Sequence, residues 1–121
     1  MIGIGIDLVD VERFRRSLLR TPSLKEKLFR SDEQAYAEGA ADPTERYAAR
    51  FAAKEATLKA LGLRLGSVPM YDIEILKQPS GQPDLLLHGA AAAAGDDAGV
   101  TKWLVTISHT DLVAQATVIA L

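Results

Sequence analysis

The segment Phe51–Lys59 places an acid and a base where both could take part in chemistry. Phe51, Glu55 and Lys59 follow one another at i+4 spacing, so in a helix their side chains share one face. Phe51 indicates that this face points inward, where an acid and a lysine are costly unless they pair or bind a ligand. The simpler interpretation is an ion pair between Glu55 and Lys59, which contributes only about 0.2–0.5 kcal/mol.

Asp7 could turn that face into a metal site. It follows Gly3 and Gly5 on one side of a short strand, while the alternate residues 2, 4, 6 and 8 are aliphatic and are expected to face the core. The glycine side can be approached closely by a helix, by a ligand or by both. If Asp7 and Glu55 converge, a cation would remove their repulsion, and Mg²⁺ typically binds one or two carboxylates together with phosphate oxygens. The spacing alone does not decide whether they converge.

The composition narrows the choice of chemistry. The chain has 121 residues, which indicates one domain over 1–121, and it has no cysteine, which excludes disulfides, thiolate metal sites and a cysteine nucleophile. Oxygen ligands favour Mg²⁺ or Mn²⁺ over Zn²⁺. A net charge of −2 argues against a nucleic-acid-binding protein, and no apolar run is long enough to span a membrane. No signal peptide is recognisable, so we expect a cytoplasmic protein.

A long helix must carry Glu55 and Lys59. The order Asp42-Pro43-Thr44-Glu45 is typical of a helix start and Gly62 of a helix end, so we predict a helix over 43–61. Hydrophobic and turn patterns predict shorter helices over 11–20, 22–29, 32–38 and 89–98, and strands over 2–8, 71–76, 84–88, 103–108 and 113–120. This order indicates an α+β fold in which a small antiparallel sheet packs around the long helix.

These motifs resemble those of the holo-acyl-carrier-protein synthases, the small class of 4′-phosphopantetheinyl transferases. That family combines a Gly-hydrophobic-Asp motif near the N-terminus with a later Phe/Trp-small-x-Lys-Glu-Ala-x-x-Lys motif. The chain shows Gly5-Ile6-Asp7 and then Phe51-Ala52-Ala53-Lys54-Glu55-Ala56-Thr57-Leu58-Lys59, and the resemblance extends over its whole length. It implies the 4′-phosphopantetheinyl transferase fold.

The resemblance also implies a reaction and its catalytic residues. A serine of apo acyl carrier protein attacks the β-phosphate of coenzyme A, phosphopantetheine is transferred, and adenosine 3′,5′-bisphosphate leaves, which is a step that serves fatty acid biosynthesis. Asp7 and Glu55 would hold Mg²⁺, with Mn²⁺ as an alternative, and Lys59 would stabilise the leaving phosphate. Phosphoryl chemistry of this kind depends mainly on positioning and charge neutralisation.

Contacts to the substrate also carry over. The residues expected to contact coenzyme A are Arg50, Lys54, Lys59, His109 and Gly62. The loop at residues 62–67 departs from the Gly-Thr-Gly pattern that the family often has after the long helix. For Arg50 and Lys54, a solvated basic face stays open as the alternative.

Three arginines share one face of the predicted helix over 11–20. Arg13, Arg16 and Arg20 would complement an acidic carrier protein, and Arg13 stands where the family has a carrier-binding arginine. The alternative is a solvated basic face balanced by Asp10 and Glu12.

The resemblance implies a homotrimer with its sites between subunits. We expect the final strands at the interface, because they offer more apolar surface than one small core needs, at Val105, Ile107, Val113, Val118 and Ile119.

Two other functions fit the sequence less well. A non-catalytic module that binds coenzyme A or a carrier protein would need a damaged Asp-Glu-Lys set, whereas the set is intact. A dinucleotide-binding domain, suggested by Gly3 and Gly5, would need a third glycine that opens a helix, whereas residues 6–8 continue a strand.

Overall fold

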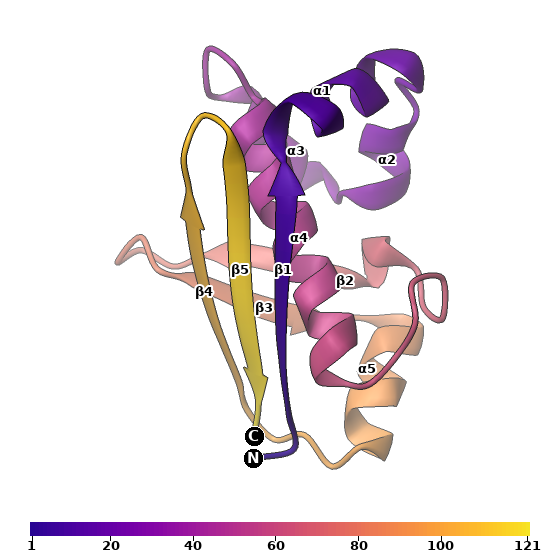
Figure 1. Cartoon of the computed structure of the whole chain (residues 1–121). Coiled ribbons are helices and arrows are strands. Elements are labelled where there is room, and N and C mark those ends of the chain that lie inside the picture. Colours follow the sequence, from indigo (N-terminus) through magenta and orange to yellow (C-terminus); the bar gives the residue numbers. More distant parts are fainter.

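The computed structural model describes residues 1–121 and contains two antiparallel sheets around one long helix (Figure 1). The larger sheet has the order β1-β5-β4, formed by Gly3–Asp10, Val113–Ala120 and Trp103–His109. The strands β2 (Ile73–Lys77) and β3 (Pro83–Leu87) form a separate hairpin. The fold is therefore α+β, as predicted, and both chain ends lie at the same end of the larger sheet (Figure 1).

Five helices accompany the sheets, and their bounds agree with the predicted ranges to within two residues. They are α1 (Val11–Arg20), α2 (Leu24–Leu28), α3 (Ser31–Glu38), α4 (Thr44–Ala60) and α5 (Gly89–Asp97). The strand predicted over 71–76 begins only at Ile73, because Met70–Asp72 forms a 3₁₀ turn closed by a 3.0 Å bond from the Asp72 N–H to the Pro69 carbonyl. None of the helices combines the length and the apolar character that crossing a membrane requires.

The helix α4 lies directly against β1 because small residues meet there. Its alanines at 48, 52, 53, 56 and 60 are buried. A Cβ atom on Gly3 would stand 1.9 Å from the Ala60 carbonyl oxygen, and one on Gly5 would stand 2.0 Å from the Ala56 carbonyl oxygen. Only glycine allows this approach of strand backbone to helix backbone. The helix face that carries Glu55 and Lys59 is thereby held next to Asp7.

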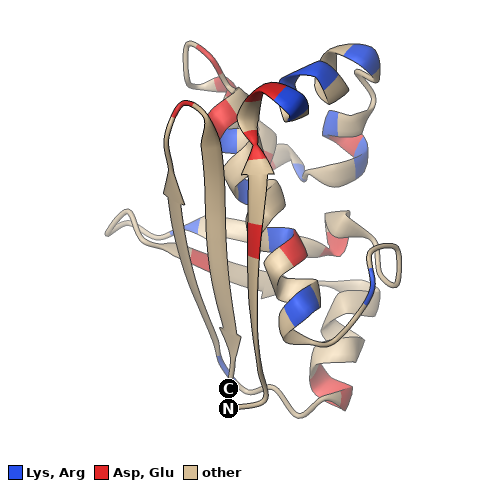
Figure 2. Ribbon diagram, viewed as in Figure 1, with Lys and Arg blue, Asp and Glu red and all other residues tan.

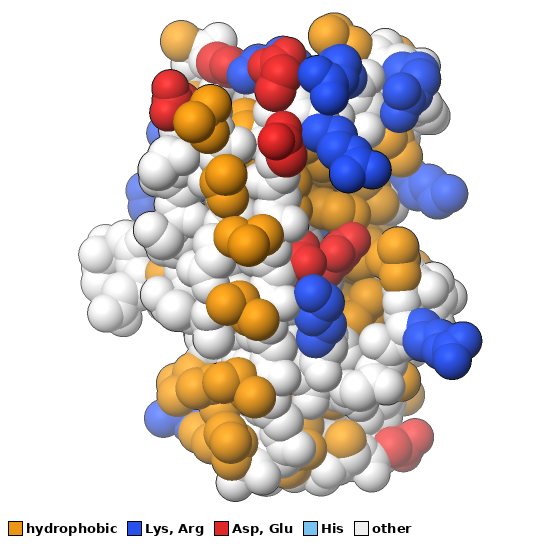
Figure 3. Space-filling model, viewed as in Figure 1, with side chains coloured by type: hydrophobic (Ala, Val, Ile, Leu, Met, Phe, Trp, Pro, Cys, Tyr) orange, Lys and Arg blue, Asp and Glu red, His pale blue; other side chains and the backbone are white.

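The prediction that the aliphatic side of β1 faces the core is wrong. Ile4, Ile6 and Leu8 are more than half exposed, because the glycine side is the one that admits α4. In the sheet register Ile4 pairs with Ile119, which in turn pairs with Leu104, so the aliphatic surface continues across all three strands. Figure 3 shows hydrophobic side chains in a row over this sheet.

The apolar surface expected on the final strands is divided between the two sides of the sheet. Val118 is completely buried, and Val105 and Ile107 pack against the core around α4. Val113 is exposed and Ile119 is half-buried. Of the five residues predicted for an interface, only these last two belong to the outward side, because side chains alternate along a strand.

Candidate active site

Asp7 and Lys59 meet at the contact between β1 and α4. The Lys59 Nζ donates a 3.1 Å hydrogen bond to Asp7 Oδ1 and a 2.9 Å bond to the carbonyl of Ile6. Lys59 therefore forms its ion pair with Asp7 and not with Glu55, so the simpler interpretation of an isolated Glu55–Lys59 pair does not hold. In Figure 2 the lower of the two acidic bands on β1 stands beside an acidic band of α4, with basic bands of the same helix next to it.

Glu55 also converges on Asp7. The fold raises the pKa of Glu55 to about 7, first because the carboxyl is partly removed from water and then because the charge of Asp7 is close. The nearby ammonium of Lys59 acts in the opposite direction but does not cancel the rise. Two carboxylates that compete for one proton in this way are the arrangement expected of a cation site.

The two carboxylates fit a hard divalent cation. Asp7 is 8% exposed, and its Oδ2 atom is buried without a hydrogen-bond partner. An orphaned carboxylate oxygen beside a second carboxylate offers the oxygen ligands that Mg²⁺ prefers. No third acidic or imidazole group joins them, so other ligands of the ion would come from water or substrate. Asp7 and Glu55 would therefore hold the metal that the sequence predicted.

A groove of about 820 Å³ opens onto these carboxylates between β1, α1, α2 and α4. Asp7, Glu55 and Arg13 are among its polar lining residues. Its apolar wall includes Phe14, Leu24, Leu28, Phe51, Leu65 and Met70. Phe51, predicted to be core, is half-buried and stacks on Phe14 with 5.1 Å between ring centroids. The carboxylates thus lie beside an apolar groove that could accept part of a partner.

The arginines of α1 point away from the core. Val11, Phe14 and Leu18 form the buried stripe of α1, as predicted, and the Asp10 carboxylate caps the helix by accepting a 2.8 Å bond from the Arg13 N–H. Arg13, Arg16 and Arg20 are exposed and form no ion pair, whereas the neighbouring Arg15 is paired with Glu12 and Asp42. Basic positions concentrate on α1 and α2 in Figure 2.

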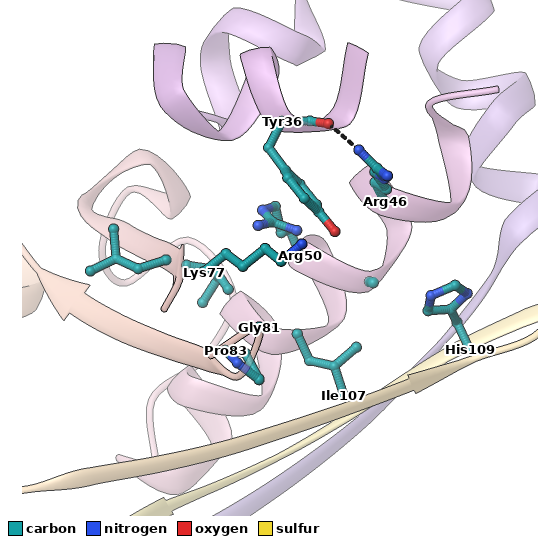
Figure 4. Close-up of a pocket in the computed structure, with 11 residues that line it drawn as sticks. Tyr36, Arg46, Arg50, Lys77, Gly81, Pro83, Ile107 and His109 are labelled. Atoms are coloured by element: carbon teal, nitrogen blue, oxygen red, sulfur yellow. Dashed lines mark hydrogen bonds between the residues drawn. The ribbon is translucent and has the colours of Figure 1, made fainter. Parts of the chain in front are cut away.

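Arg50 and His109 meet in a second, basic pocket of about 180 Å³ (Figure 4). His109 ends β4 instead of lying in the hairpin turn, and its Nδ1 is 3.1 Å from Glu45 Oε1. Tyr36, Arg46 and Lys77 also line this pocket, and the sequence analysis missed them. No sequence pattern singled them out, because a lone tyrosine and single cations are common on exposed helices and strands.

The pocket and the groove lie on different sides of α4. They share no lining residue. Arg50 and Glu55 are five positions apart on the helix, which rotates their side chains about 140° from each other.

Three of the predicted contact residues line neither cavity: Lys54, Gly62 and Lys59, which is instead paired with Asp7. Lys54 is completely buried, and its ammonium bonds Glu33 at 2.8 Å, the Met70 carbonyl at 3.0 Å and the Ile73 carbonyl. All three of its protons are used, so the prediction that Lys54 contacts a phosphate is wrong. Gly62 is exposed at the end of α4 with a φ of 69°, which accounts for glycine there through the turn geometry.

Comparison with known proteins identifies the family. Residues 3–116 match the model of the 4′-phosphopantetheinyl transferase superfamily. The chain therefore belongs to the 4′-phosphopantetheinyl transferase superfamily.

Within that superfamily the similar proteins are of one kind. The chain is 43% identical over 120 residues to the holo-[acyl-carrier-protein] synthase of Salinispora arenicola, covering 99% of this chain and 98% of the relative. It is 44% identical to that of Streptomyces griseus, with the same coverage. The resemblance found in the sequence is confirmed.

Solved structures of such synthases have the same fold. The enzyme of Neisseria meningitidis superposes with a TM-score of 0.90 at 27% identity, covering 100% of this chain and 98% of that one. The enzyme of Helicobacter pylori, described in complex with coenzyme A, gives a TM-score of 0.86 at 28% identity, covering 98% and 99%.

Proposed function

We propose that this protein transfers 4′-phosphopantetheine from coenzyme A to a serine of apo acyl carrier protein and releases adenosine 3′,5′-bisphosphate. The observation that carries the proposal is the convergence of Asp7, Glu55 and Lys59 in a chain related over its whole length to holo-[acyl-carrier-protein] synthases. The Helicobacter pylori relative binds coenzyme A, which is the expected donor.

The reaction requires a proton acceptor, a positive charge beside the leaving phosphate and charge neutralisation on the pyrophosphate. The serine oxygen forms a bond to the β-phosphorus of coenzyme A, the bridging oxygen leaves with adenosine bisphosphate, and the serine proton must be accepted. Glu55 is the carboxylate placed to accept this proton, either directly or through a water molecule. Lys59 is half exposed beside Asp7 and can neutralise the leaving phosphate. Mg²⁺ bound by Asp7 and Glu55 would supply charge neutralisation on the pyrophosphate.

The carrier protein is proposed to dock over the groove. Arg13 lines the groove, and Arg16 and Arg20 are exposed and unpaired on the same helix. An acidic partner would meet these arginines before its serine reaches Glu55. The apolar wall of the groove would then be covered by the partner. The cytoplasm remains the proposed compartment for this reaction.

Coenzyme A is proposed to bridge two subunits of a homotrimer. Arg50 and His109, which were predicted to contact its phosphates, line a pocket that the groove of the same chain does not reach. A neighbouring subunit could bring its pocket to the groove. The exposed aliphatic surface around Ile4, Leu104 and Ile119 supports such an assembly, since surfaces of this kind commonly mark interfaces.

Mass spectrometry tests the transfer directly. Apo acyl carrier protein, coenzyme A and Mg²⁺ incubated with the protein should yield a carrier heavier by one phosphopantetheine group. The same mixture with excess chelator should give none, and addition of Mn²⁺ or Mg²⁺ should restore the product. Absence of any mass gain with several carriers, under conditions where a known transferase modifies them, would refute the proposal.

A further inference from the structure

Three cationic side chains meet the ring of Tyr36. The guanidinium carbons of Arg46 and Arg50 lie 4.2 Å and 3.9 Å from the ring centroid, and the ammonium of Lys77 lies 5.1 Å from it. The ring comes from α3, the arginines from α4 and the lysine from β2. Figure 4 shows the ring between the two guanidinium groups, all within one pocket.

No carboxylate forms an ion pair with this cluster, and Glu33, whose charge acts on Arg50 from a distance, is already paired with Lys54. Neither arginine nor Lys77 has a carboxylate within ion-pair distance, although Asp32 and Glu74 border the hollow next to the pocket and Glu45 contacts His109. Arg50 is only 7% exposed and its Nε has no hydrogen-bond partner. Burial lowers the pKa of Arg50. By contrast, the buried Lys54 is fully satisfied by Glu33 and two carbonyls.

A buried guanidinium without a carboxylate indicates a missing anion. Removal of such a charge from water is costly unless an opposite charge replaces the water. The Tyr36 ring offsets part of this cost by cation–π attraction, and the Tyr36 carbonyl accepts a 2.7 Å bond from Arg46 Nη1. Neither contact neutralises the charge. A phosphate monoester, with nearly two negative charges and three acceptor oxygens, is the ligand that two guanidinium forks suit best.

We propose that Tyr36 is a positioning residue, which holds Arg46 and Arg50 on opposite sides of its ring so that the pocket selects a ligand carrying a phosphate monoester. This inference rests on the proposed function. With Tyr36 in place, the pocket would distinguish coenzyme A from molecules that lack the 3′-phosphate. Tyr36 acts through the arginines and touches no reacting atom. Without the ring, the two like charges would move apart into solvent and no longer converge on one phosphate.

Calorimetric binding tests this role with two nucleotides. The ligands are adenosine 3′,5′-bisphosphate and adenosine 5′-monophosphate, and the proteins are the unaltered chain, Tyr36→Leu and Tyr36→Phe. Tyr36→Leu should weaken binding of the bisphosphate about tenfold and leave the affinity for the monophosphate unchanged. The reason is that the lost contacts hold the arginines that bind the second phosphate. Tyr36→Phe keeps the aromatic face and should retain most of the preference for the bisphosphate over the monophosphate.

The outcomes separate this inference from the proposed function. If Tyr36→Leu keeps the full preference for the bisphosphate, or weakens both nucleotides equally, the positioning role is refuted while phosphopantetheine transfer by the unaltered protein can still be seen. If the unaltered protein transfers nothing, the proposed function falls. Arg46→Gln supplies a second test that leaves the ring intact, and it should lower the preference in the same direction as Tyr36→Leu. An unchanged preference in Arg46→Gln would refute the shared phosphate site even if Tyr36→Leu did not fold.

Discussion

At the carboxylate site, burial and the nearby charge of Asp7 make Glu55 harder to ionise than a free glutamate. Its pKa of about 7 lies above the ordinary value of 4.5, so the folded protein binds this proton more tightly than the unfolded chain. In metal-free protein the contribution of Glu55 to stability is therefore fully present below pH 4.5 and is lost as the pH rises through 7.

Glu55→Gln should remove this loss of stability at high pH. In the presence of chelator, the free energy of unfolding of the variant should equal that of the unaltered chain at pH 4.5 and exceed it by about 1 kcal/mol at pH 8, after allowance for solvent screening of this half-exposed group. Urea unfolding at several pH values measures the difference. A variant that is less stable at pH 8 would show that the two carboxylates do not repel each other in the metal-free state.

Lys54 and Lys59 have the same side chain, but Lys54 is expected to stabilise the fold and Lys59 to take part in catalysis. Lys54→Met should lower the free energy of unfolding by about 3 kcal/mol, because it leaves Glu33 buried without its partner. Lys59→Met should change stability by less than about 1 kcal/mol, because Lys59 is half exposed, but it should strongly reduce turnover. Thermal unfolding and a turnover assay on both variants check the contrast. Equal stability losses would contradict it.

At the scale of elements, α1 is expected to govern encounter with the carrier protein. Arg16→Ala and Arg20→Ala should each lower kcat/KM for the carrier about fivefold at low salt and leave KM for coenzyme A unchanged, because exposed charges mainly speed association. The difference should shrink at high salt, where the charges are screened. Lys102→Ala is a matched control, since Lys102 is exposed and unpaired on another part of the molecule. A salt-independent loss would argue for a structural role of α1.

The elements themselves were largely predictable, and the orientation of β1 was not. Turn residues and apolar periodicity gave α1, α4 and β5 nearly residue for residue. Alternation along β1 separates its two sides, but it does not say which side faces inward, because isoleucine normally marks the core and glycine marks close approach. Here the close approach of α4 to Gly3 and Gly5 makes the glycine side of β1 the inward one.

The site was predictable where a motif joined two elements and unpredictable elsewhere. Asp7, Glu55 and Lys59 were singled out because an acid and a lysine on an inward face need an explanation. Lys54 was misassigned because its partner Glu33 lies in another helix, which spacing within α4 cannot show. Tyr36 and Arg46 were missed for the same reason, since their contact depends on how α3 packs against α4.

At the scale of the whole molecule, the outward side of the larger sheet is expected to hold the trimer together. Ile4→Lys places a charge in the row formed with Ile119 and Leu104, so the assembly should dissociate toward the 13.0 kDa monomer. Light scattering after size-exclusion chromatography measures the mass. Ala98→Lys, on an exposed position after α5, should remain trimeric. A monomeric unaltered protein would contradict the proposed assembly.

The separation of the basic pocket from the carboxylate groove has a consequence for mixtures of defective chains. Asp7→Asn chains keep the basic pocket intact but lose a carboxylate, and Arg50→Ala chains keep both carboxylates but lose part of the pocket. Each variant alone should therefore be inactive. If a working centre takes its carboxylates from one chain and its pocket from the next, chains of the two types that assemble at random in equal amounts should recover about a quarter of full activity. If one chain supplied both parts, the mixture would stay inactive. Complementation between two dead proteins would thus reveal where one chain's contribution ends and its neighbour's begins.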